Sequence, residues 1–342
     1  KCPGAQGCED ADGALMVGVS SVDITPELET FEDLNGNGRR DEDELFIDLD
    51  GDEEWDPVWL AGSHGGRAAT DVHDAIWARA ITIEKGATSL AIVALDLVGI
   101  NQPDVITIRR AAQAVGLEFD HIAIMATHQQ QGPDTLGLWG PERGVSGADP
   151  EYLARVSEQI IEALRDAQQA AQEATLRIGV AETPGLVRDG RLPDSMQHLV
   201  HTIGFVGADT RLFASLMVWG NHPETLGPEN TSITSDFPHY TREAMERAYP
   251  GSTAVFVNGI LGGVTTPVGI VGCPDAFGKE QCAQGSFERS EYVGQSLAKM
   301  AIESLHIDRR VVDLDPKLAL RRLPFMIGTS NPALAMPILT GM

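Results

Sequence analysis

The chain has 342 residues, a formal net charge of −25 and a hydrophobic content of 42%. That apolar content is sufficient for a globular core, whereas the negative charge argues against nucleic acid and anionic membrane surfaces as partners. No run of about 18 apolar residues occurs, so the sequence predicts no transmembrane segment.

Apolar runs and helical patterns alternate along the chain. Strands are predicted at residues 15–24, 78–84, 90–97, 122–127, 176–181, 200–206, 212–219 and 254–257, and helices at 104–115, 150–174, 237–248 and 290–306. The helix at 150 is marked by a capping aspartate, Asp149, and by a proline at its first position. This order predicts an α/β fold with layered β-sheets flanked by α-helices. We assign residues 1–342 to a single domain.

Four cysteines fall into two local pairs, Cys2 with Cys8 and Cys273 with Cys282. Two closely spaced pairs favour two small disulfide loops and an oxidising compartment. The alternatives are free thiols and a zinc knuckle, although no histidine adjoins either pair. We therefore expect a secreted, periplasmic or cell-surface protein.

An acidic insertion occupies residues 28–60, and its span 31–56 holds twelve acidic residues against two basic ones. Residues 33–44 match the twelve-residue calcium loop D-x-[DN]-x-[DN]-G-x5-E at every defined position. Calcium takes six to eight oxygen ligands, with a bidentate glutamate at the twelfth position and a glycine turn at the sixth. The predicted ligands are Asp33, Asn35, Asn37, the Arg39 carbonyl, Asp41 through water, and Glu44.

A second acidic cluster follows, and its predicted calcium ligands are Asp48, Asp50, Asp52 and Asp56. It repeats the start of the first loop but lacks the glycine at position six and the glutamate at position twelve. A solvated acidic loop is the alternative for both clusters. Because so many carboxylates repel one another without a cation, we expect calcium to order the insertion.

Among nine histidines, His128 and His222 share one setting. Each follows a predicted strand and precedes a turn that contains proline, and strand ends are where sites assemble in layered α/β folds. Neutral imidazoles at two strand ends suit a zinc ion, which needs three or four N, O or S ligands. The alternative is a histidine that is hydrogen-bonded within the fold.

Four sets of segments, in chain order over residues 15–270, carry a resemblance to a known family. They are 18–26 (GVSSVDITP); 72–80 with 91–97 (VHDAIWARA, AIVALDL); 126–133 (ATHQQQGP); and 221–223, 235–237 and 256–267 (NHP, SDF, FVNGILGGVTTP). These resemble the opening strand, the paired strands, the T-H-x-H-S-G-P zinc motif, and the second zinc histidine with its G-D-V-[SN]-P loop in the neutral/alkaline (non-lysosomal) ceramidase family. The resemblance implies that family's N-terminal catalytic domain.

In that family one zinc ion activates a water that attacks an amide carbonyl. The resemblance makes His128 and His222 the two histidine ligands, while the family's glutamate and tyrosine ligands lie further towards the C-terminus and have no match before Met342. We therefore expect a C-terminal segment or a second chain to complete the site.

Three departures from the family pattern affect the expected chemistry. Gln130 and Gln131 replace a histidine and a serine of the zinc motif, and the G-D-V-S-P loop has Gly263 and Thr265 in place of its Asp and Ser. Gln130, Thr265 and Asp236 are the candidate catalytic residues, and His64, His73 and His239 are further candidates to replace the lost polar groups.

Two functions from different classes follow. The first is a secreted zinc-dependent amide hydrolase that acts on ceramide, on another sphingolipid-like amide or on an unrelated amide. The second is a catalytically degenerate, calcium-stabilised extracellular binding or assembly protein on a ceramidase-like scaffold. The altered glutamine and glycine positions favour the second, and the retained His128 and His222 favour the first.

Overall fold

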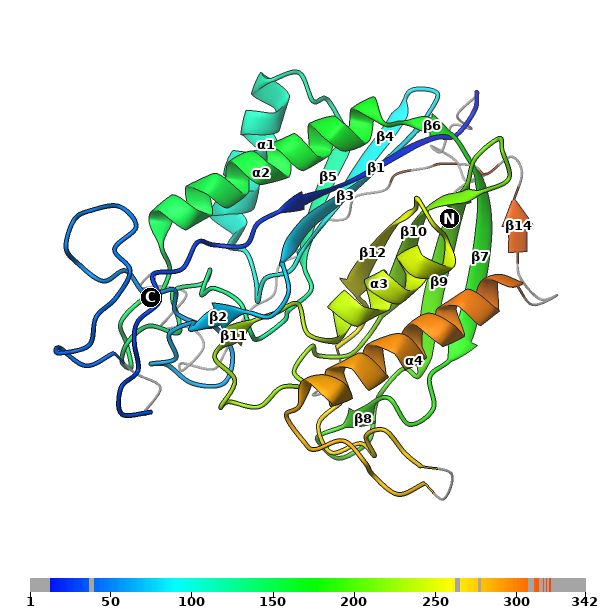
Figure 1. The fold of residues 1–342 in the computed structure, drawn as a ribbon. Helices are drawn as coiled ribbons and strands as arrows, with labels where there is room; N and C mark the ends of the chain where they lie inside the picture. Colours follow the sequence, from blue (N-terminus) through cyan, green and yellow to red (C-terminus); the bar gives the residue numbers. More distant parts are fainter. Residues whose placement is uncertain are drawn as a thin grey trace.

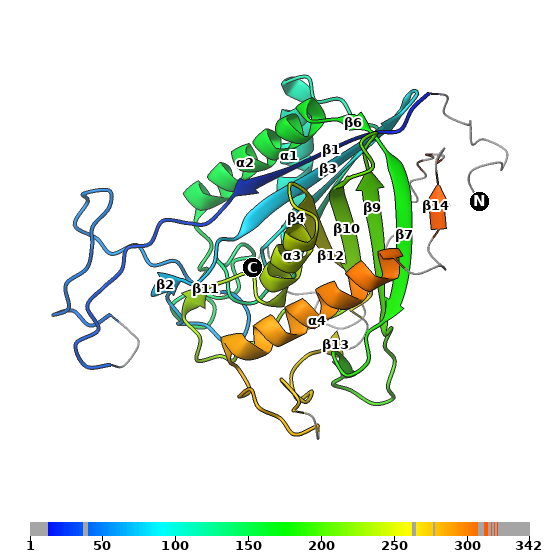
Figure 2. The same cartoon turned by 45° about the vertical axis from the view of Figure 1, so that its right-hand side comes forward.

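The computed structural model describes residues 13–36, 40–261, 265–275, 278–306 and 311–313, with positions 316, 318 and 320. Within these residues two five-stranded sheets lie face to face, and a pair of helices covers the outer face of each (Figures 1 and 2). The predicted layered α/β architecture is confirmed.

The first sheet has the strand order β5-β4-β3-β1-β6. Its strands are β1 (Met16–Asp23), β3 (Trp77–Lys85), β4 (Thr88–Leu95), β5 (His121–Ala126) and β6 (Gln172–Glu173). Only β4 and β5 are parallel in this sheet, and α1 (Gln102–Ala114) connects them. α2 (Pro150–Gln169) begins where the sequence predicts, because the Asp149 side chain accepts a hydrogen bond from the backbone N–H of Glu151.

The second sheet has the order β12-β10-β9-β7-β14. Its strands are β7 (Thr175–Glu182), β9 (Leu199–Val206), β10 (Leu212–Trp219), β12 (Thr253–Asn258) and β14 (Val311–Asp313). β10 and β12 form a parallel pair connected through α3 (Phe237–Ala248), and α4 (Phe287–His306) lies beside α3. Two short ladders pair β2 (Asp71–Val72) with β11 (Ser232–Ile233), and β8 (Arg188–Asp189) with β13 (Thr265–Thr266).

Three apolar clusters fill the spaces between these layers. One lies between the first sheet and its helices and includes Ile160 and Leu164 of α2. A second lies between the second sheet and α3 and α4, around Trp219. The third joins the two sheets through residues such as Ile81 and Phe205. Because all three clusters are buried and closely packed, the strand ends have fixed positions relative to one another.

The structure differs from the sequence prediction at the end of the second helix. The predicted helix reaches residue 174, but α2 ends at Gln169 and the chain continues as β6. Pairing of β6 with the edge of β1 offers backbone hydrogen bonds that a longer helix would lose. The five short strands β2, β8, β11, β13 and β14 are too brief to leave a periodic pattern.

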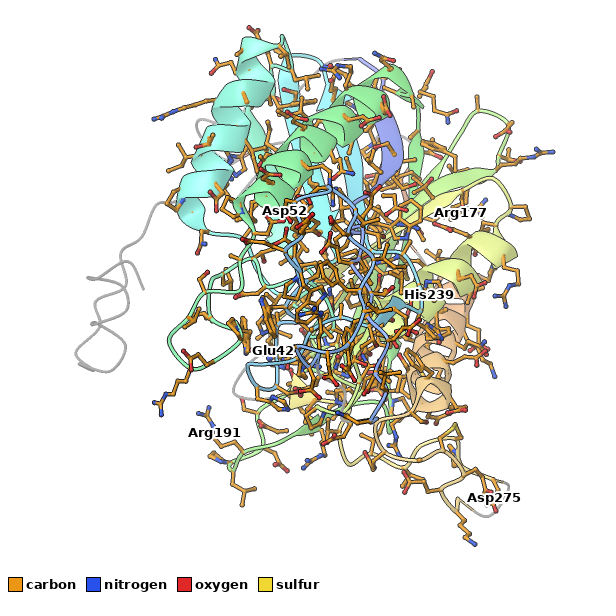
Figure 3. The ribbon with its side chains drawn as sticks, turned by 60° about the vertical axis from the view of Figure 1, so that its left-hand side comes forward. Glu42, Asp52, Arg177, Arg191, His239 and Asp275 are labelled. Carbon is orange, nitrogen blue, oxygen red and sulfur yellow. A yellow bond between two sulfur atoms is a disulfide. The ribbon has the colours of Figure 1, made fainter. Side chains whose placement is uncertain are left out.

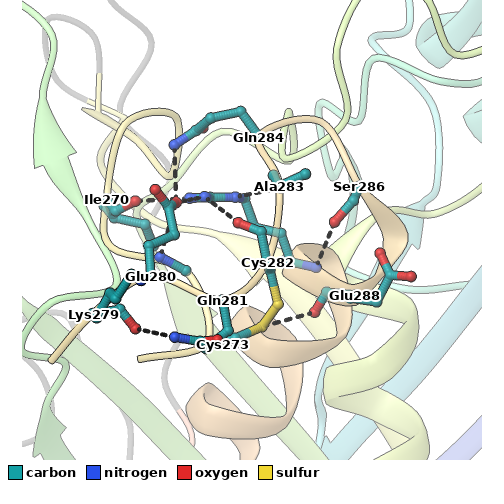
Figure 4. Close-up of a disulfide and its surroundings, with 12 residues drawn as sticks. Ile270, Cys273, Lys279, Glu280, Gln281, Cys282, Ala283, Gln284, Ser286 and Glu288 are labelled. Atoms are coloured by element: carbon teal, nitrogen blue, oxygen red, sulfur yellow. Dashed lines mark hydrogen bonds and ion pairs between the residues drawn. A yellow bond between two sulfur atoms is a disulfide. The ribbon is translucent and has the colours of Figure 1, made fainter. Parts of the chain in front are cut away.

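The disulfide between Cys273 and Cys282 is present (Figure 4). Beside it the buried guanidinium of Arg289 donates to the carbonyls of Ile270, Ala283 and Cys282 and pairs with Glu280. The loop before α4 is thus closed by a covalent bond and by an arginine. Cys2, Cys8, Gly263 and the apolar stretch 324–342 lie outside the described residues. No helix in the described part of the chain is long and apolar enough to cross a membrane.

Candidate functional site

The carboxyl ends of the two parallel strand pairs bring His128 and His222 together. His128 follows β5 in the first sheet, and His222 follows β10 in the second. Their ring centroids lie 5.3 Å apart with an interplanar angle of 62°. His128 has φ of 63°, a conformation that few residues with a side chain adopt, and such strain gathers at functional sites.

Each imidazole is oriented by a backbone carbonyl. The Nδ1 of His128 lies 2.6 Å from the Val98 carbonyl oxygen, and the Nδ1 of His222 lies 2.5 Å from that of Thr265. Because a carbonyl only accepts, each Nδ1 donates its hydrogen to that carbonyl, and in a neutral imidazole the lone pair then lies on Nε2. A backbone carbonyl that accepts from Nδ1 is typical of histidines that bind a metal ion through Nε2.

Two hydrogen bonds join the two sheets beside the histidines. The Gln130 N–H donates to the Pro223 carbonyl at 3.3 Å, and the side-chain amide of Asn258, at the end of β12, donates to the Thr127 carbonyl. His128 itself is tied to the first sheet, since its N–H donates to the Leu97 carbonyl at 3.0 Å. The pair is therefore held by contacts within each sheet and between the sheets.

The three glutamines after His128 have different environments. Gln129 and Gln131 are buried, and Gln129 donates to the Asp96 carbonyl at 2.8 Å and accepts from the Gln131 N–H at 2.6 Å. Gln130 is half-buried, and its side chain has no hydrogen bond among the described residues. Gly62 packs so closely on Gln130 that a Cβ at position 62 would lie 2.5 Å from the Gln130 Cβ. Gln130 thus has the one carboxamide of the three that is available to a ligand.

Arg67 is a buried residue that sequence reasoning missed. Its guanidinium donates to the Gln131 Oε1 at 3.0 Å and to the carbonyls of Ala61, Gln130 and Asn230. Among the described residues it has no carboxylate partner, and burial lowers the pKa of its guanidinium. Arg67 follows a Gly-Gly dipeptide in the sequence, which gave no sign that a buried cation fixes the loop after His128.

Thr265 contributes to the site mainly through its backbone. Its carbonyl accepts from both the N–H and the Nδ1–H of His222, while its hydroxyl donates to the Leu261 carbonyl at 2.7 Å. The predicted catalytic use of the Thr265 hydroxyl remains a prediction. Its carbonyl is a contact that the sequence could not reveal.

Asp236 is fully buried and caps α3. Its carboxylate accepts from the backbone of Thr225, Leu226 and Phe237 and from the hydroxyls of Thr225 and Ser290. Burial raises the pKa of this carboxyl to about 6. Asp236 therefore fixes the loop that follows His222, and its predicted catalytic role remains a prediction.

Among the described residues, none of the other candidate histidines forms a hydrogen bond with His128 or His222. His73 and His239 both contact the buried carboxylate of Asp74, at 3.0 and 3.4 Å. Burial lowers the pKa of the His239 imidazole. His64 is exposed, and its Nδ1 contacts the neighbouring Gly65 carbonyl.

Asp96 and Arg242 form a buried ion pair at the end of β4. Asp96, one residue after β4, accepts two hydrogen bonds from Arg242 of α3, at 2.8 and 2.7 Å. The same carboxylate accepts from the Ser235 hydroxyl and the Trp77 N–H. This pair joins the first sheet to α3, the helix that packs on the second sheet. The Leu-Asp signature after β4 was visible in the sequence, but its arginine partner was not.

The acidic insertion forms loops that project beyond the end of β1 (Figure 1), and Glu42 and Asp52 mark these loops in Figure 3. In the first acidic loop the buried Glu44 carboxylate accepts from the N–H groups of Leu34 and Asp41, at 2.8 and 2.9 Å. Asp33 accepts from the Gly36 N–H at 2.7 Å, and the Asn35 amide donates to Asp41 at 2.6 Å. The predicted ligands Asn37 and Arg39 lie outside the described residues.

The second cluster repeats these contacts with a residue from outside its own loop. Asp48 accepts from the Gly51 N–H at 2.7 Å, as Asp33 does from Gly36. The buried Glu29 carboxylate accepts from the N–H groups of Leu49 and Asp56, both at 2.8 Å. Leu49 and Asp56 occupy loop positions two and nine, as do Leu34 and Asp41. Glu29 thus has the place that Glu44 has in the first loop, and sequence reasoning missed it.

Oxygen atoms of the second cluster lie close enough for shared coordination. Glu29, Asp48 and Asp50 form one group, and Asp50, Asp52 and Asp56 another, with the ligand atoms of each group within 4.8 Å of one another. Burial and the nearby carboxylates of Asp52, Glu29 and Asp50 raise the pKa of Asp56. Such crowding is the electrostatic environment that a divalent cation relieves.

Comparison with known proteins shows the fold. No protein-family model and no curated protein matches the chain. Neutral ceramidase from Pseudomonas aeruginosa superposes with a TM-score of 0.65 and 18% identity, over 86% of this chain and 45% of that one. A ceramidase complexed with C2 superposes with a TM-score of 0.64 and 19% identity, over 86% and 44%. The fold is therefore ceramidase-like, and the chain spans less than half the length of these neighbours.

Proposed function

We propose that the strand-end site is a zinc-dependent amide hydrolase centre, with His128 and His222 as ligands. One observation carries the proposal: both Nδ1 atoms bind backbone carbonyls, which leaves both Nε2 atoms for a metal ion. The ring separation of 5.3 Å is compatible with two imidazoles that share one ion. The ceramidase-like fold supports a hydrolase scaffold.

The donor set fits zinc because two neutral imidazoles are ordinary ligands of its tetrahedral sites. Bound zinc would polarise an amide carbonyl and acidify a water molecule. Two histidines do not complete the four-coordinate shell of a tetrahedral zinc ion. We propose that a further segment of chain or a second chain supplies the remaining protein ligands.

We propose Gln130 as the residue of this chain that contacts the amide. Its carboxamide has no other partner among the described residues, and it donates and accepts hydrogen bonds without taking a proton. We propose that its N–H groups bind the carbonyl oxygen as negative charge develops there. Thr265 and Asp236 support this step by holding His222 and the loop after it.

The proposed substrate is an amide whose acyl and amine parts need not be those of ceramide. The two structural neighbours described above are ceramidases. Gln131, at the position of the family's serine, is committed to Arg67 and Asn230. Its side chain therefore serves the loop, which favours a substrate that differs from the family's.

Two measurements test this function. Purified protein is expected to contain one zinc ion per chain, and the His128→Ala, His222→Ala double variant none. Amide turnover is measured with ceramide and with short N-acyl amines, with the double variant as the matched control. A wild-type chain without stoichiometric zinc, or with equal turnover in the double variant, would refute the proposal.

A second function has a specific observation behind it. Gln130 cannot act as a general base, and Gln129 and Gln131 are both used inside the loop. This favours a catalytically degenerate, calcium-stabilised extracellular binding or assembly protein. Zinc binding without turnover of any tested amide would support this second function over the first.

Calcium is the second proposed cofactor, with one ion in each acidic loop. The repeated pattern of contacts supports it: Glu44 in the first loop and Glu29 in the second each accept from loop positions two and nine. We propose that these ions order the insertion at residues 28–60. A secreted, periplasmic or cell-surface location follows as a proposal, supported by the Cys273–Cys282 disulfide.

A further inference from the structure

Asn258 connects the two sheets at the point where the histidines meet. It is the last residue of β12 and lies opposite Trp219, the last residue of β10, in the parallel ladder. His222 follows Trp219 by three residues. The side-chain amide of Asn258 leaves its own sheet and donates to the carbonyl of Thr127, the residue before His128. One side chain thus joins the strand end of each histidine.

The backbone contact that also spans this junction is longer. The Gln130 N–H lies 3.3 Å from the Pro223 carbonyl oxygen, near the outer limit for a hydrogen bond of this kind. The Asp96–Arg242 pair joins the layers too, but through the end of β4 and the middle of α3. Asn258 is therefore the side chain with the most direct hold on the spacing between the two histidine loops.

The other half of the Asn258 carboxamide has no hydrogen-bond partner in the part of the chain that the structure describes. Its Oδ1 is buried without a hydrogen bond among the described residues, as is the Thr127 Oγ1. A buried acceptor without a partner is unfavourable, so an apolar residue would suit this position better if it served packing alone. What asparagine adds at position 258 is the N–H donor aimed at the other sheet.

We propose that Asn258 is a positioning residue for the histidine pair, which fixes the distance and angle between the two imidazoles and so sets the affinity for zinc. This inference rests on the proposed zinc site. Metal ligands must hold their positions to within a few tenths of an ångström. Loss of an outer contact that orients a ligand costs about 10- to 100-fold in metal affinity. Asn258 acts one step further out, through the backbone of Thr127.

The test compares an isosteric change with a truncation. Asn258→Asp keeps the shape and removes the donor, and Asn258→Ser leaves a hydroxyl too short to reach the Thr127 carbonyl. Zinc affinity is measured by competition with a chromophoric chelator, and the visible spectrum of the Co²⁺-loaded protein reports ligand geometry. Both variants are expected to bind zinc at least tenfold more weakly, with a shifted or weakened Co²⁺ spectrum. Asn101→Asp is the control, since Asn101 is exposed and its side chain caps nothing.

The outcomes separate this inference from the proposed function. If the wild-type chain binds no zinc, the zinc site itself is refuted. If the wild-type chain binds zinc and both Asn258 variants keep its affinity and Co²⁺ spectrum, the positioning role is refuted while the zinc site stands. If neither variant folds, as judged by circular dichroism, Asn258 is a determinant of the fold rather than of the site, and the inference is overturned.

Discussion

The histidine pair and the acidic insertion are both candidate metal sites, and they are built in opposite ways. The histidines come from two sheets, and carbonyls of Val98 and Thr265, also distant in sequence, orient them. The carboxylates of the insertion come from one stretch of chain, and backbone N–H groups of that same stretch hold them. The first set is fixed by the buried core, and the second by contacts within residues 28–60.

This difference has a consequence for metal binding. Neutral imidazoles do not repel one another, so the fold holds the pair in place before an ion arrives. Carboxylates such as Asp50, Asp52 and Asp56 do repel one another, so we expect a cation to stabilise their arrangement. We therefore expect zinc to occupy a preformed site and calcium to create order in the insertion.

Removal of calcium is the largest test of this contrast. An ion present at 100 times its Kd stabilises the folded state by about 2.7 kcal/mol, so two ions contribute about 5 kcal/mol. EGTA is expected to lower the melting temperature and to expose residues 28–60 to protease. Added Ca²⁺, but not Mg²⁺ or Zn²⁺, restores both. An unchanged melting curve and cleavage pattern would contradict a structural role for calcium.

Substitution of the histidines is expected to weaken zinc binding and to leave the acidic insertion unchanged. His128→Ala and His222→Ala should each weaken zinc binding at least 1000-fold, which corresponds to about 4 kcal/mol. The calcium-dependent protease resistance of residues 28–60 should not change, because the described ligands of the two sites share no hydrogen bond. His64→Ala is the control, since His64 is exposed and its one hydrogen bond among the described residues is to the neighbouring Gly65 carbonyl. Equal zinc affinity in all three variants would refute the histidine site.

The titration of Asp236 tests the region around the histidines by pH alone. Its pKa is about 6 in the folded protein and near 4 in an unfolded chain. The folded state therefore binds the proton more tightly, and stability falls as pH rises from about 4 to about 6. The change is at most about 3 kcal/mol.

Unfolding free energies at pH 4, 5 and 6 measure this effect against the Asp236→Asn variant. Asparagine still caps a helix well but does not titrate over this range. The difference in stability between the two proteins should change across the interval and level off above pH 6. A constant difference from pH 4 to pH 6 would mean that Asp236 does not titrate there.

A matched pair of glutamates sharpens the comparison within the insertion. Glu29→Gln and Glu44→Gln each keep the shape of the side chain and remove its charge. We expect each variant to weaken the binding of one calcium ion by about 10- to 100-fold, or about 1.4 to 2.7 kcal/mol. The affinity for the other ion should stay nearly unchanged. Isothermal titration calorimetry measures both sites, with the exposed Glu27→Gln as control. If only Glu44→Gln changes calcium binding, the second site does not depend on Glu29.

The sequence was sufficient where the determinants are local. The Asp149 cap and its proline predicted the start of α2, which the structure confirms. The match of residues 33–44 to a calcium loop stays a prediction. The sequence was insufficient where a contact uses the backbone or a distant residue. Every residue has a carbonyl, so nothing distinguished Val98 or Thr265 as orienting groups.

Glu29 illustrates the same limit in the insertion. It precedes the second loop by 19 residues and belongs to no motif, so only the folded chain shows that it closes that loop. Arg67 is similar, since its four acceptors come from three separate segments. Such residues are found by asking which buried charged group has the contacts that a motif lacks.

The position of Glu29 also nests one candidate calcium site inside the other. The contact between Glu29 and Asp56 closes a ring of chain that spans 27 residues, and the whole first loop lies within that ring. An ion that closes the first loop shortens the flexible chain in the ring by less than half. Each doubling of the length of a flexible loop raises the entropic cost of closing it by about 0.6 kcal/mol. Binding of one ion is therefore expected to raise the affinity for the other about twofold. The insertion then fills with weak positive cooperativity that originates in chain connectivity, without direct contact between the ions.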